Sequence, residues 1–315
     1  MTHLNVLFMG ASGLVGLLER FQAAARAEEI GLRILSLEDS SPWHAISVAA
    51  VGQVISAPSF RGEAFEPFLS ALVEKEGISI VIPCIDAATI ALCGLRTKYA
   101  ERGVSLVVSS RELCEAMHDK AQAEVFFQQH NIPTPLGTVY PVLAKPRFGA
   151  SSRGQVLLGD AEELEFWLRR NDRDKFVLQP FIQGTEYSVD AYVSRAGRPQ
   201  GAVSRVREVV SGGEAMVTRT HHNPRVEAVV DRFLQIPGWQ GPLTVQVIDA
   251  GENAYVIECN PRVGSGVTCS IEAGLDVPRW IMREHLGRPL PADTLVWKSG
   301  LCMTRSRKDH FLWLS

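Results

Sequence analysis

The first third of the chain alternates short apolar runs with segments of helical periodicity, and this alternation limits the fold more than any other feature. The apolar runs are Asn5–Met9, Leu32–Leu37, Ile78–Pro83 and Ser105–Val108, and the helical segments are Leu17–Glu29, Glu63–Glu76 and Ala87–Ala100. Such alternation predicts parallel strands joined by right-handed crossovers, with helices on both faces of the sheet. We therefore expect an α/β domain at the start of the chain.

A second region begins after a helix predicted at Ser110–His130, which ends where Pro133 and Pro135 exclude further helix. The sequence beyond is rich in strand patterns, as in an α+β domain. We expect strands at Val142–Lys145, Gln155–Leu158, Phe176–Pro180, Tyr187–Val193, Gly201–Val209, Leu243–Asp249 and Ala254–Cys259, and helices at Ala161–Arg170, Arg225–Leu234 and Val277–Leu286. A length of 315 residues favours two or three lobes.

Composition excludes several classes of function. The net charge of −3 and the pI near 6.3 give no reason to expect a nucleic-acid partner. The N-terminus lacks the pattern of a signal peptide, and no run approaches the ~20 apolar residues that span a bilayer, so we expect no membrane partner. The six cysteines form no Cys-x-x-Cys pair, which favours reduced thiols and a cytoplasmic location.

A glycine loop, Gly10–Gly16, follows the first predicted strand and opens a helix. This context suits a dinucleotide pyrophosphate, and Glu38 or Asp39 could bind a ribose at the end of the next strand. The spacing, however, is Gly-x-x-Gly-x-x-Gly, which also serves to pack a helix on a strand. The loop alone leaves an NAD(P)-dependent oxidoreductase as an alternative.

A second glycine loop, Phe148–Gly154, follows the apolar strand that carries Lys145. Backbone N–H groups of its small residues can approach phosphate oxygens, and the lysine supplies a compact positive charge. The members of this loop that we assign to phosphate binding are Gly149, Ser151, Ser152 and Gly154. The alternative is a surface hairpin with an incidental lysine.

The strand at Phe176–Pro180 leads through Phe181 and Ile182 to a turn at Gly184. A polar edge at Gln179 and the backbone through Ile182 could read an adenine. Glu186, just after the turn, is placed to accept hydrogen bonds from ribose hydroxyls. The alternative is an exposed acid in a hairpin turn.

The last two predicted strands flank Gly251-Glu252-Asn253 and predict a hairpin. A three-residue loop would pair Ala250 with Ala254, Ile248 with Val256, and Gln246 with Glu258. Glu258 and Asn260 share a face because side chains alternate along a strand. Three oxygen donors, Gln246, Glu258 and Asn260, would then converge, and such ligands suit Mg²⁺ between nucleotide phosphates. A two-residue loop would set Gln246 against Ile257 instead.

The sequence allows two interpretations of Arg262, which follows this hairpin. Pro261–Gly266 forms a turn that carries Arg262 and small residues, and this turn could hold an anionic intermediate. The alternative is an ion pair between Arg262 and Glu258, because a buried carboxylate without a partner is costly.

Taken together, these residues resemble the ATP-grasp enzymes. The matching elements are Asp119-Lys120, Lys145 with the loop Gly149–Gly154, Gln179–Ile182, Glu186, and the set Gln246, Glu258 and Asn260 that ends in Asn-Pro-Arg. Glu258-Cys259-Asn260-Pro261-Arg262, with Gln246 in place of an acid, is similar to the ATP-grasp modules of the carbamoyl-phosphate synthase large subunit. Single-module relatives include amino-acid ligases.

The resemblance implies a fold class and a division of the chain. A Rossmann-like pre-ATP domain would occupy residues 1–111, and a linking helix with a small lid would occupy residues 112–178. A mixed-sheet ATP-grasp domain would occupy residues 179–315. The whole would be α/β, with an α+β C-terminal part.

The resemblance also implies roles for single residues. Lys120 and Lys145 would contact ATP phosphates; Gln179, Phe181 and Ile182 would line the adenine pocket, and Glu186 would bind the ribose. Gln246, Glu258 and Asn260 would hold Mg²⁺, with Mn²⁺ as an alternative. Arg262 would act in catalysis with Lys145. Candidates for the substrate are Arg205, Arg207, Glu214, Gly10 and Ser12.

The implied activity is that of a ligase. A carboxylate is activated as an acyl phosphate, and an amine or a thiol then displaces phosphate, with release of ADP. One alternative is phosphorylation of a small carboxylate or carbamate, as in carbamoyl-phosphate synthase, although that enzyme works as a fused pair of modules. The others are the NAD(P)-dependent oxidoreductase and a non-catalytic ATP-binding regulator. The expected partners are the small substrates and a second copy in a homodimer.

Overall fold

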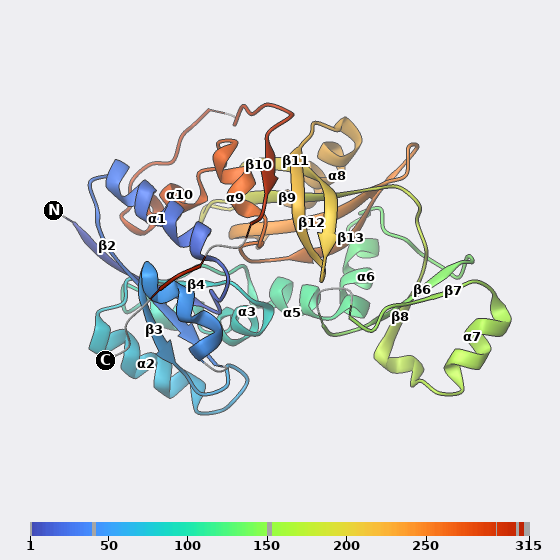
Figure 1. The fold of residues 1–315 in the computed structure, drawn as a ribbon, viewed down its shortest axis with the longest axis horizontal. Coiled ribbons are helices and arrows are strands. Elements are labelled where there is room, and N and C mark those ends of the chain that lie inside the picture. The colour runs from blue at the N-terminus through green and yellow to red at the C-terminus, as the bar shows by residue number, and fades with distance from the viewer. Residues whose placement is uncertain (1, 40–41, 150–152, 294, 307–308, 312–315) are drawn as a thin grey trace.

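Three β-sheets organise the computed structural model, which describes residues 2–39, 42–149, 153–293, 295–306 and 309–311 (Figure 1). The strand orders are β3-β2-β1-β4-β5, β7-β6-β8 and β13-β12-β9-β10-β11-β14. None of the described helices is long and apolar enough to cross a membrane.

The first sheet has only parallel pairs among its described strands, as the alternating pattern predicts. Its strands are β1 (His3–Met9), β2 (Gly31–Glu38), β3 (Gln53–Ser56), β4 (Ile80–Pro83) and β5 (Ser105–Leu106). Its helices are α1 (Val15–Ala27), the 3₁₀ segment Pro42–Ala50, α2 (Phe65–Glu76), α3 (Asp86–Cys93) and α4 (Arg96–Ala100). Alternate residues of β1 enter two different cores: Val6 and Phe8 pack with α1, whereas Leu7 and Met9 pack with α2 and α3. Both faces of the sheet are therefore covered.

One predicted helix, Ser110–His130, is in fact two: α5 (Arg111–His118) and α6 (Lys120–Gln129). Asp119 between them is extended, with φ −106° and ψ 113°, and its carboxylate accepts from the N–H of Ala121 at 3.0 Å. The same carboxylate binds the guanidinium of Arg147. Asp119 thus ends one helix and caps the next, because its side chain satisfies an N–H that a continuous helix would have paired. The predicted helix Ala87–Ala100 is likewise broken at Gly94-Leu95 into α3 and α4.

The small second sheet forms a lobe at the right-hand end of Figure 1. It consists of β6 (Val142–Pro146), β7 (Val156–Leu158) and β8 (Phe176–Pro180), with α7 (Ala161–Leu168) and a 3₁₀ turn at Arg173–Lys175. All its described pairs are antiparallel. The division at residue 178 that we propose falls within β8.

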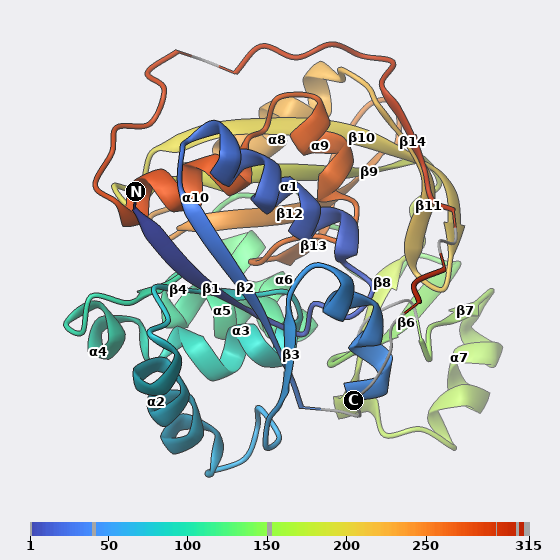
Figure 2. The same cartoon turned by 60° about the vertical axis from the view of Figure 1, so that its left-hand side comes forward.

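The third sheet is antiparallel in all its described pairs. It contains β9 (Thr185–Val193), β10 (Pro199–Ser211), β11 (Glu214–Thr220), β12 (Gly241–Asp249), β13 (Ala254–Asn260) and β14 (Cys302–Thr304). Helix α8 (Pro224–Leu234) covers one face, and α9 (Val267–Glu272) and α10 (Val277–His285) cover the other. Figure 2 shows α1 beside α9 and α10, so the first and third sheets share a core. The sequence patterns missed β3, β11, β14 and α9.

Candidate active site

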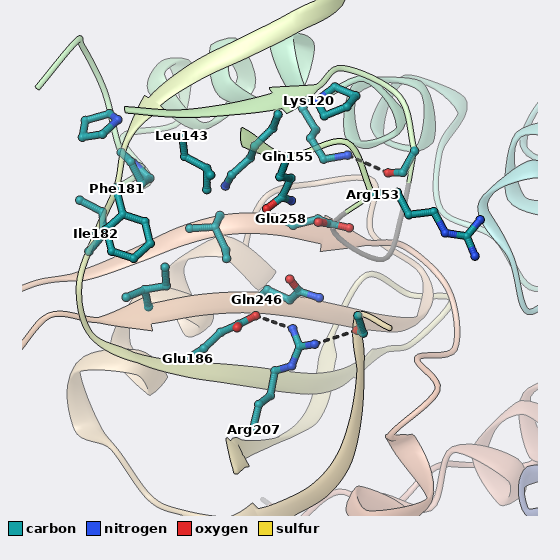
Figure 3. A pocket seen from close by; sticks show the side chains of 18 of the residues that line it. Lys120, Leu143, Arg153, Gln155, Phe181, Ile182, Glu186, Arg207, Gln246 and Glu258 are labelled. Carbon is teal, nitrogen blue, oxygen red and sulfur yellow. Dashed lines mark hydrogen bonds and ion pairs between the residues drawn. The ribbon is translucent and has the colours of Figure 1, made fainter. Parts of the chain in front are cut away.

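A cavity of about 240 Å³ lies between the small lobe and the third sheet, and we call it the lid cavity (Figure 3). Leu143, Phe181 and Ile182 form an apolar wall, and Lys120, Lys145 and Glu258 bring charges to the opposite part. Further lining residues include Gly149, Arg153, Gln155, Glu186, Arg207, Gly213 and Gln246. An apolar wall facing a few charged groups is typical of a small-molecule site.

Lys145 is a buried cation of this cavity, with 9% of its surface exposed. Burial lowers the pKa of its ammonium group, while the nearby carboxylate of Glu258 acts in the opposite sense. Its side chain makes no hydrogen bond or ion pair to another residue that the structure describes. An anionic ligand in the lid cavity would therefore supply the partner that this cation lacks.

Lys120 begins α6 and fastens the glycine loop that follows β6. Its ammonium donates to the carbonyl of Gly149 at 2.8 Å (Figure 3), and its N–H donates to the carbonyl of Arg147 at 3.1 Å. Gly149 and Gly154 have φ of 123° and 72°, a region that favours glycine. Ser151 and Ser152, which we assigned to phosphate binding, lie outside the described residues.

The hairpin of β12 and β13 pairs Gln246 with Glu258, as predicted. The predicted turn, however, is wrong: Ala254 pairs with Asp249 and Val256 with Val247, and the N–H of Ala250 donates to the carbonyl of Asn253 at 2.9 Å. A register shift between Gln246 and Val247 leaves Ile257 as an extra residue. This β-bulge restores the alignment that the longer turn would have lost.

A second cavity, of about 280 Å³, adjoins the first, and we call it the loop cavity because Gly10, Ser12 and Leu14 line it. It is also lined by Asp86, Arg205, Glu214, Thr244, Asn260, Arg262 and Gly264–Gly266. Gln246, Glu258, Arg207 and Gly213 line both cavities. The paired residues of the hairpin therefore stand at the junction of two cavities.

Arg262 carries the main positive charge of the turn after this hairpin. Its Nε donates to Asp86 at 2.6 Å, and its Nη2 donates to Asn260 Oδ1 at 3.1 Å. The ion pair with Glu258 that the sequence left open is not found among the described residues, because Asp86 at the start of α3 takes that role. Sequence reasoning missed Asp86, which lies 176 positions away.

Known proteins resemble this chain in sequence and in fold. Residues 172–308 match the family model described as "ATP-grasp in the biosynthetic pathway with Ter operon". The carbamoyl phosphate synthase large chain of Clostridium acetobutylicum is 23% identical over 224 residues, which cover 62% of this chain and 21% of the relative. The carbamoyl phosphate synthase large chain of Thermus thermophilus is 26% identical over 196 residues, which cover 53% of this chain and 19% of the relative. The chain thus spans about a fifth of the length of these relatives.

Solved structures agree over most of the chain. N5-carboxyaminoimidazole synthetase from Staphylococcus aureus, complexed with ADP, has a TM-score of 0.71 at 16% identity and covers 94% of this chain and 81% of its own. L-amino acid ligase from Bacillus licheniformis has a TM-score of 0.66 at 19% identity, with 91% and 75% covered. The chain has the ATP-grasp fold. The biotin carboxylase domain of Hydrogenobacter thermophilus 2-oxoglutarate carboxylase, whose structure holds MgADP, has a TM-score of 0.70 at 16% identity, with 92% and 71% covered.

Two residues predicted for separate roles at this site are in contact. The carboxylate of Glu186, from β9, binds the guanidinium of Arg207, from β10, and Arg207 also donates to the carbonyl of Gly213 at 2.7 Å (Figure 3). Arg207 is among the residues that line both cavities. Sequence reasoning assigned these residues to ribose and substrate, and it missed their pairing.

A backbone N–H of the N-terminal glycine loop already has a hydrogen-bond acceptor within the protein. The buried carboxylate of Glu38 accepts from the N–H of Ala11 at 3.1 Å and from the Ser36 hydroxyl at 2.7 Å, and burial raises its pKa. A dinucleotide pyrophosphate would need such amides free and would meet a carboxylate there. Glu38 is therefore a partner of the loop and has no access to a ribose.

The remaining predicted residues are buried or paired with other side chains. Arg205 is 1% exposed and forms a buried ion pair with Asp190 at 2.8 Å, so it supports the wall of the loop cavity. A Cβ at Gly266 would lie 2.7 Å from Arg205 Nη1, which explains the glycine there. Glu214 pairs with Arg305 at 2.8 Å. Gln179 is buried in β8 near Glu124 and is outside the lining of the lid cavity as far as the described residues show it.

The donor set at the junction fits a hard cation. Glu258 offers a carboxylate and Gln246 an amide, and neither Glu258 Oε2 nor the Gln246 amide is hydrogen bonded to a described residue. Asn260 donates to Glu258 Oε1 at 3.1 Å while its oxygen accepts from Arg262, so Asn260 would have to turn to bind a metal. The described residues contain no cluster of three or more His, Cys, Asp or Glu that could hold a metal ion.

Proposed function

We propose that this protein is an ATP-dependent ligase that joins a carboxylate to an amine or a thiol through an acyl phosphate. The observation that carries the proposal is that the lid cavity and the loop cavity meet at Gln246 and Glu258. A nucleotide in the first cavity and a carboxylate in the second would bring the γ-phosphate and its acceptor together at one place. Proximity of this kind is a large part of catalysis of phosphoryl transfer.

The lid cavity is the proposed nucleotide site. The apolar wall at Leu143, Phe181 and Ile182 suits a purine, and Lys145 and Lys120 would face the phosphates. Glu186 would bind the ribose hydroxyls if its ion pair with Arg207 opened. Solved structures of the same fold contain ADP or MgADP by their own descriptions, which supports this assignment.

Gln246, Glu258 and Asn260 are the proposed holders of Mg²⁺, or of Mn²⁺. Such an ion, when bound, neutralises charge on the β- and γ-phosphates. The residues themselves orient the phosphate chain at the junction, and Lys145 provides positive charge on the opposite side. Exclusion of water by the small lobe would strengthen these interactions.

Arg262 is the proposed stabiliser of the anionic acceptor. A carboxylate oxygen of the substrate attacks the γ-phosphorus, and the bond to ADP breaks. The amine nitrogen or thiol sulfur then attacks the acyl carbon, phosphate leaves, and the nucleophile loses a proton. Arg262, between Asp86 and Asn260, lines the loop cavity where the carboxylate would lie. Asp86 would hold the guanidinium in orientation.

A screen of amino acids and other carboxylates for ADP release tests the proposal. We expect MgATP turnover with one carboxylate and one nucleophile, and a loss of about 10²-fold or more in Glu258→Gln. Glu252→Gln, in the exposed turn of the same hairpin, is the matched control and should behave as the unaltered protein. Normal turnover by Glu258→Gln would refute the role of the hairpin.

A second candidate is phosphorylation of a small carboxylate or carbamate, which the matches to carbamoyl phosphate synthase large chains favour. Bicarbonate belongs in the same screen: ADP release with bicarbonate and no nucleophile would select this candidate over the ligase. A homodimer and a cytoplasmic location remain predictions from sequence. Sedimentation of the purified chain tests the homodimer.

A further inference from the structure

A third cavity, of about 380 Å³, lies away from the lid and loop cavities and shares no lining residue with them. It is lined by Arg96, Ala100, Gly103, Val104, Ser105, Leu106, Arg195, Gln240 and His285, and we call it the arginine cavity. Val104 and Ser105 stand at the amino end of β5, whereas the loop cavity meets the carboxyl ends of the parallel strands β1 and β4. The two cavities are therefore at opposite ends of the first sheet.

Along the third sheet, the arginine cavity and the lid cavity also lie at opposite ends. Arg195 follows the end of β9, and Glu186 of the lid cavity is near its beginning. A strand of this length spans roughly 25–30 Å at ~3.3 Å for each residue. A ligand in the arginine cavity would thus be a separate molecule from a nucleotide in the lid cavity.

The arginine cavity contains two positive charges without a matching negative charge. Arg96 donates to the carbonyl of Val108 at 3.3 Å and to Gln240 Oε1 at 3.0 Å. Arg195 donates to the carbonyl of Glu284 at 3.3 Å and to the hydroxyl of Ser105. All these acceptors are neutral, and neither guanidinium forms an ion pair with a described carboxylate. By contrast, Arg205, Arg207 and Arg262 of the loop cavity each pair with an acid.

The carboxylate of Glu284 on α10, beside Arg195, already accepts two hydrogen bonds. It accepts from the hydroxyl of Tyr192 at 2.7 Å and from the backbone N–H of Arg195 at 2.7 Å. No Asp or Glu is among the residues that line the cavity. The two guanidinium groups are therefore held in position by neutral partners, while their charge remains available to a ligand.

His285 adds a proton-dependent group. Its Nδ1 lies 2.6 Å from the hydroxyl of Ser105, which also accepts from Arg195. This hydroxyl can donate to Nδ1 or accept from it, because its oxygen has one proton and two lone pairs. Burial and the charge of Arg195 lower the pKa of His285, and an anion beside it would favour the charged ring.

We propose that Arg96, Arg195 and His285 form a second binding site, for the oxyanion group of a small phosphorylated or carboxylated metabolite. Guanidinium groups suit such groups because they offer paired N–H donors in a fixed plane. The cavity is larger than a bare ion needs and falls within the usual range for small-molecule sites, about 300 Å³ and above. The proposal stands whether or not the ligase activity is confirmed.

Calorimetric titration tests this site with inorganic phosphate and, in a second arm, with succinate. The ionic strength is held constant, and saturating MgADP fills the lid cavity. We expect the double variant Arg96→Gln/Arg195→Gln to bind the preferred anion roughly tenfold or more weakly. Arg169→Gln, which replaces an exposed arginine just after α7, is the matched control and should bind normally. Thermal stabilisation by MgADP checks that the double variant is folded.

Two comparisons can overturn the proposal. Lys145→Met should keep the anion affinity of the unaltered protein. If Lys145→Met instead lost anion binding while the double arginine variant kept it, the anion would be assigned to the lid cavity. Absence of phosphate and succinate binding to the unaltered protein would refute the site.

A sulfate titration across pH 5.5–8 tests His285, because sulfate does not change its charge over this range. The charged groups near His285 are Arg195 from the β9–β10 turn, Arg96 from α4 and Glu284 from its own helix. Affinity should fall with rising pH in the unaltered protein and vary less in His285→Gln; an equal slope in both would exclude the histidine from the site.

Discussion

The two glycine-rich loops of the protein look alike in sequence and differ in what surrounds them. The loop at Gly10–Gly16 packs against Glu38, a buried carboxylate that accepts from a backbone N–H of the loop. The described residues Phe148, Gly149 and Arg153 of the second loop line the lid cavity together with Lys120 and Lys145. A carboxylate inside a loop competes with an anionic ligand, and lysines around a loop attract one. The number and spacing of the glycines therefore say less about phosphate binding than the charge of the loop's neighbours.

The largest effect that we expect from this comparison is in Lys145→Met. ADP release should fall by about 10²–10³-fold, because a buried cation facing the phosphates is removed. The free energy of unfolding should hold or rise, since a desolvated ammonium is replaced by an apolar side chain. Steady-state kinetics and urea unfolding measure the two quantities.

Lys175→Met is the control for that experiment. Lys175 is an exposed lysine of the same lobe, with 76% of its side chain exposed, and its loss should leave turnover unchanged. Equal losses in the two variants would mean that Lys145 acts only through the general charge of the lobe.

The next effect concerns the other loop, through Glu38→Ala. The variant leaves the N–H of Ala11 and the hydroxyl of Ser36 without their acceptor, so the free energy of unfolding should fall by about 1–3 kcal/mol. Stabilisation by MgATP should remain, because this loop is not the nucleotide site that we propose. A loss of MgATP stabilisation with the fold intact would contradict the contrast between the loops.

The raised pKa of Glu38 predicts that its contribution to stability falls as the pH rises. Its pKa is raised in the folded protein, so its favourable contribution is complete below the unfolded value of 4.5 and is lost as the pH rises through the folded pKa. Glu38→Gln, which cannot ionise, should therefore gain stability relative to the unaltered protein as the pH rises above 4.5. Urea unfolding at pH 4.5 and 7 measures this difference, and Glu63→Gln, an exposed acid, should show none.

A smaller effect is expected from the anchor of the lid loop, in Asp119→Asn. The carboxylate of Asp119 binds Arg147 and caps α6, and Arg147 precedes the loop. Weakening this anchor should raise KM for MgATP roughly two- to fivefold, with a smaller change in kcat. Asp160→Asn, at the cap of α7 in the same lobe, controls for loss of a helix cap. An equal KM change in both variants would show that the anchor has no special role.

The smallest effect concerns a carboxylate whose pKa moves the other way. Hydrogen bonds from Arg225 and Asn223 lower the pKa of Asp249 to about 2. A carboxylate with a lowered pKa stabilises the fold above its unfolded value of 3.8, and this contribution is lost as the pH falls towards 2. Asp249→Asn should cost about 0.5–1 kcal/mol at pH 7, because its arginine partner is half exposed, and less near pH 2. Acid unfolding of the two proteins tests the sign, which is opposite to that of Glu38.

Much of the fold followed from periodicity in the sequence. The parallel first sheet could be predicted because its strands are buried on both faces and read as continuous apolar runs, as at Ile80–Pro83. The missed strands lack this signal: β14 has only three residues, and two of them are exposed. The break at Asp119 was missed because the carboxylate that caps α6 also binds the guanidinium of Arg147, which follows β6 and lies 28 positions away.

The candidate site was predicted unevenly for the same reason. The pairing of Gln246 with Glu258 came out correctly although the predicted turn was wrong, because the turn and the bulge at Ile257 shift the register in opposite directions. The contacts of Arg262 with Asp86 and of Arg207 with Glu186 join separate elements, and no local pattern encodes them. Pattern within an element could be read from sequence, whereas charge pairing across elements needed the structure.

The contact between Arg262 and Asp86 has a consequence for engineering by recombination. The arginine belongs to the C-terminal part of the chain and the aspartate to the N-terminal part, so a chimera that exchanged residues 1–111 with those of a homologue would also exchange the group that orients Arg262. Only donors with a carboxylate at that position should yield hybrids that keep the acceptor chemistry. If Arg262 acts on the acceptor as we propose, substrate preference would be a shared property of two halves and could not be transplanted with one of them.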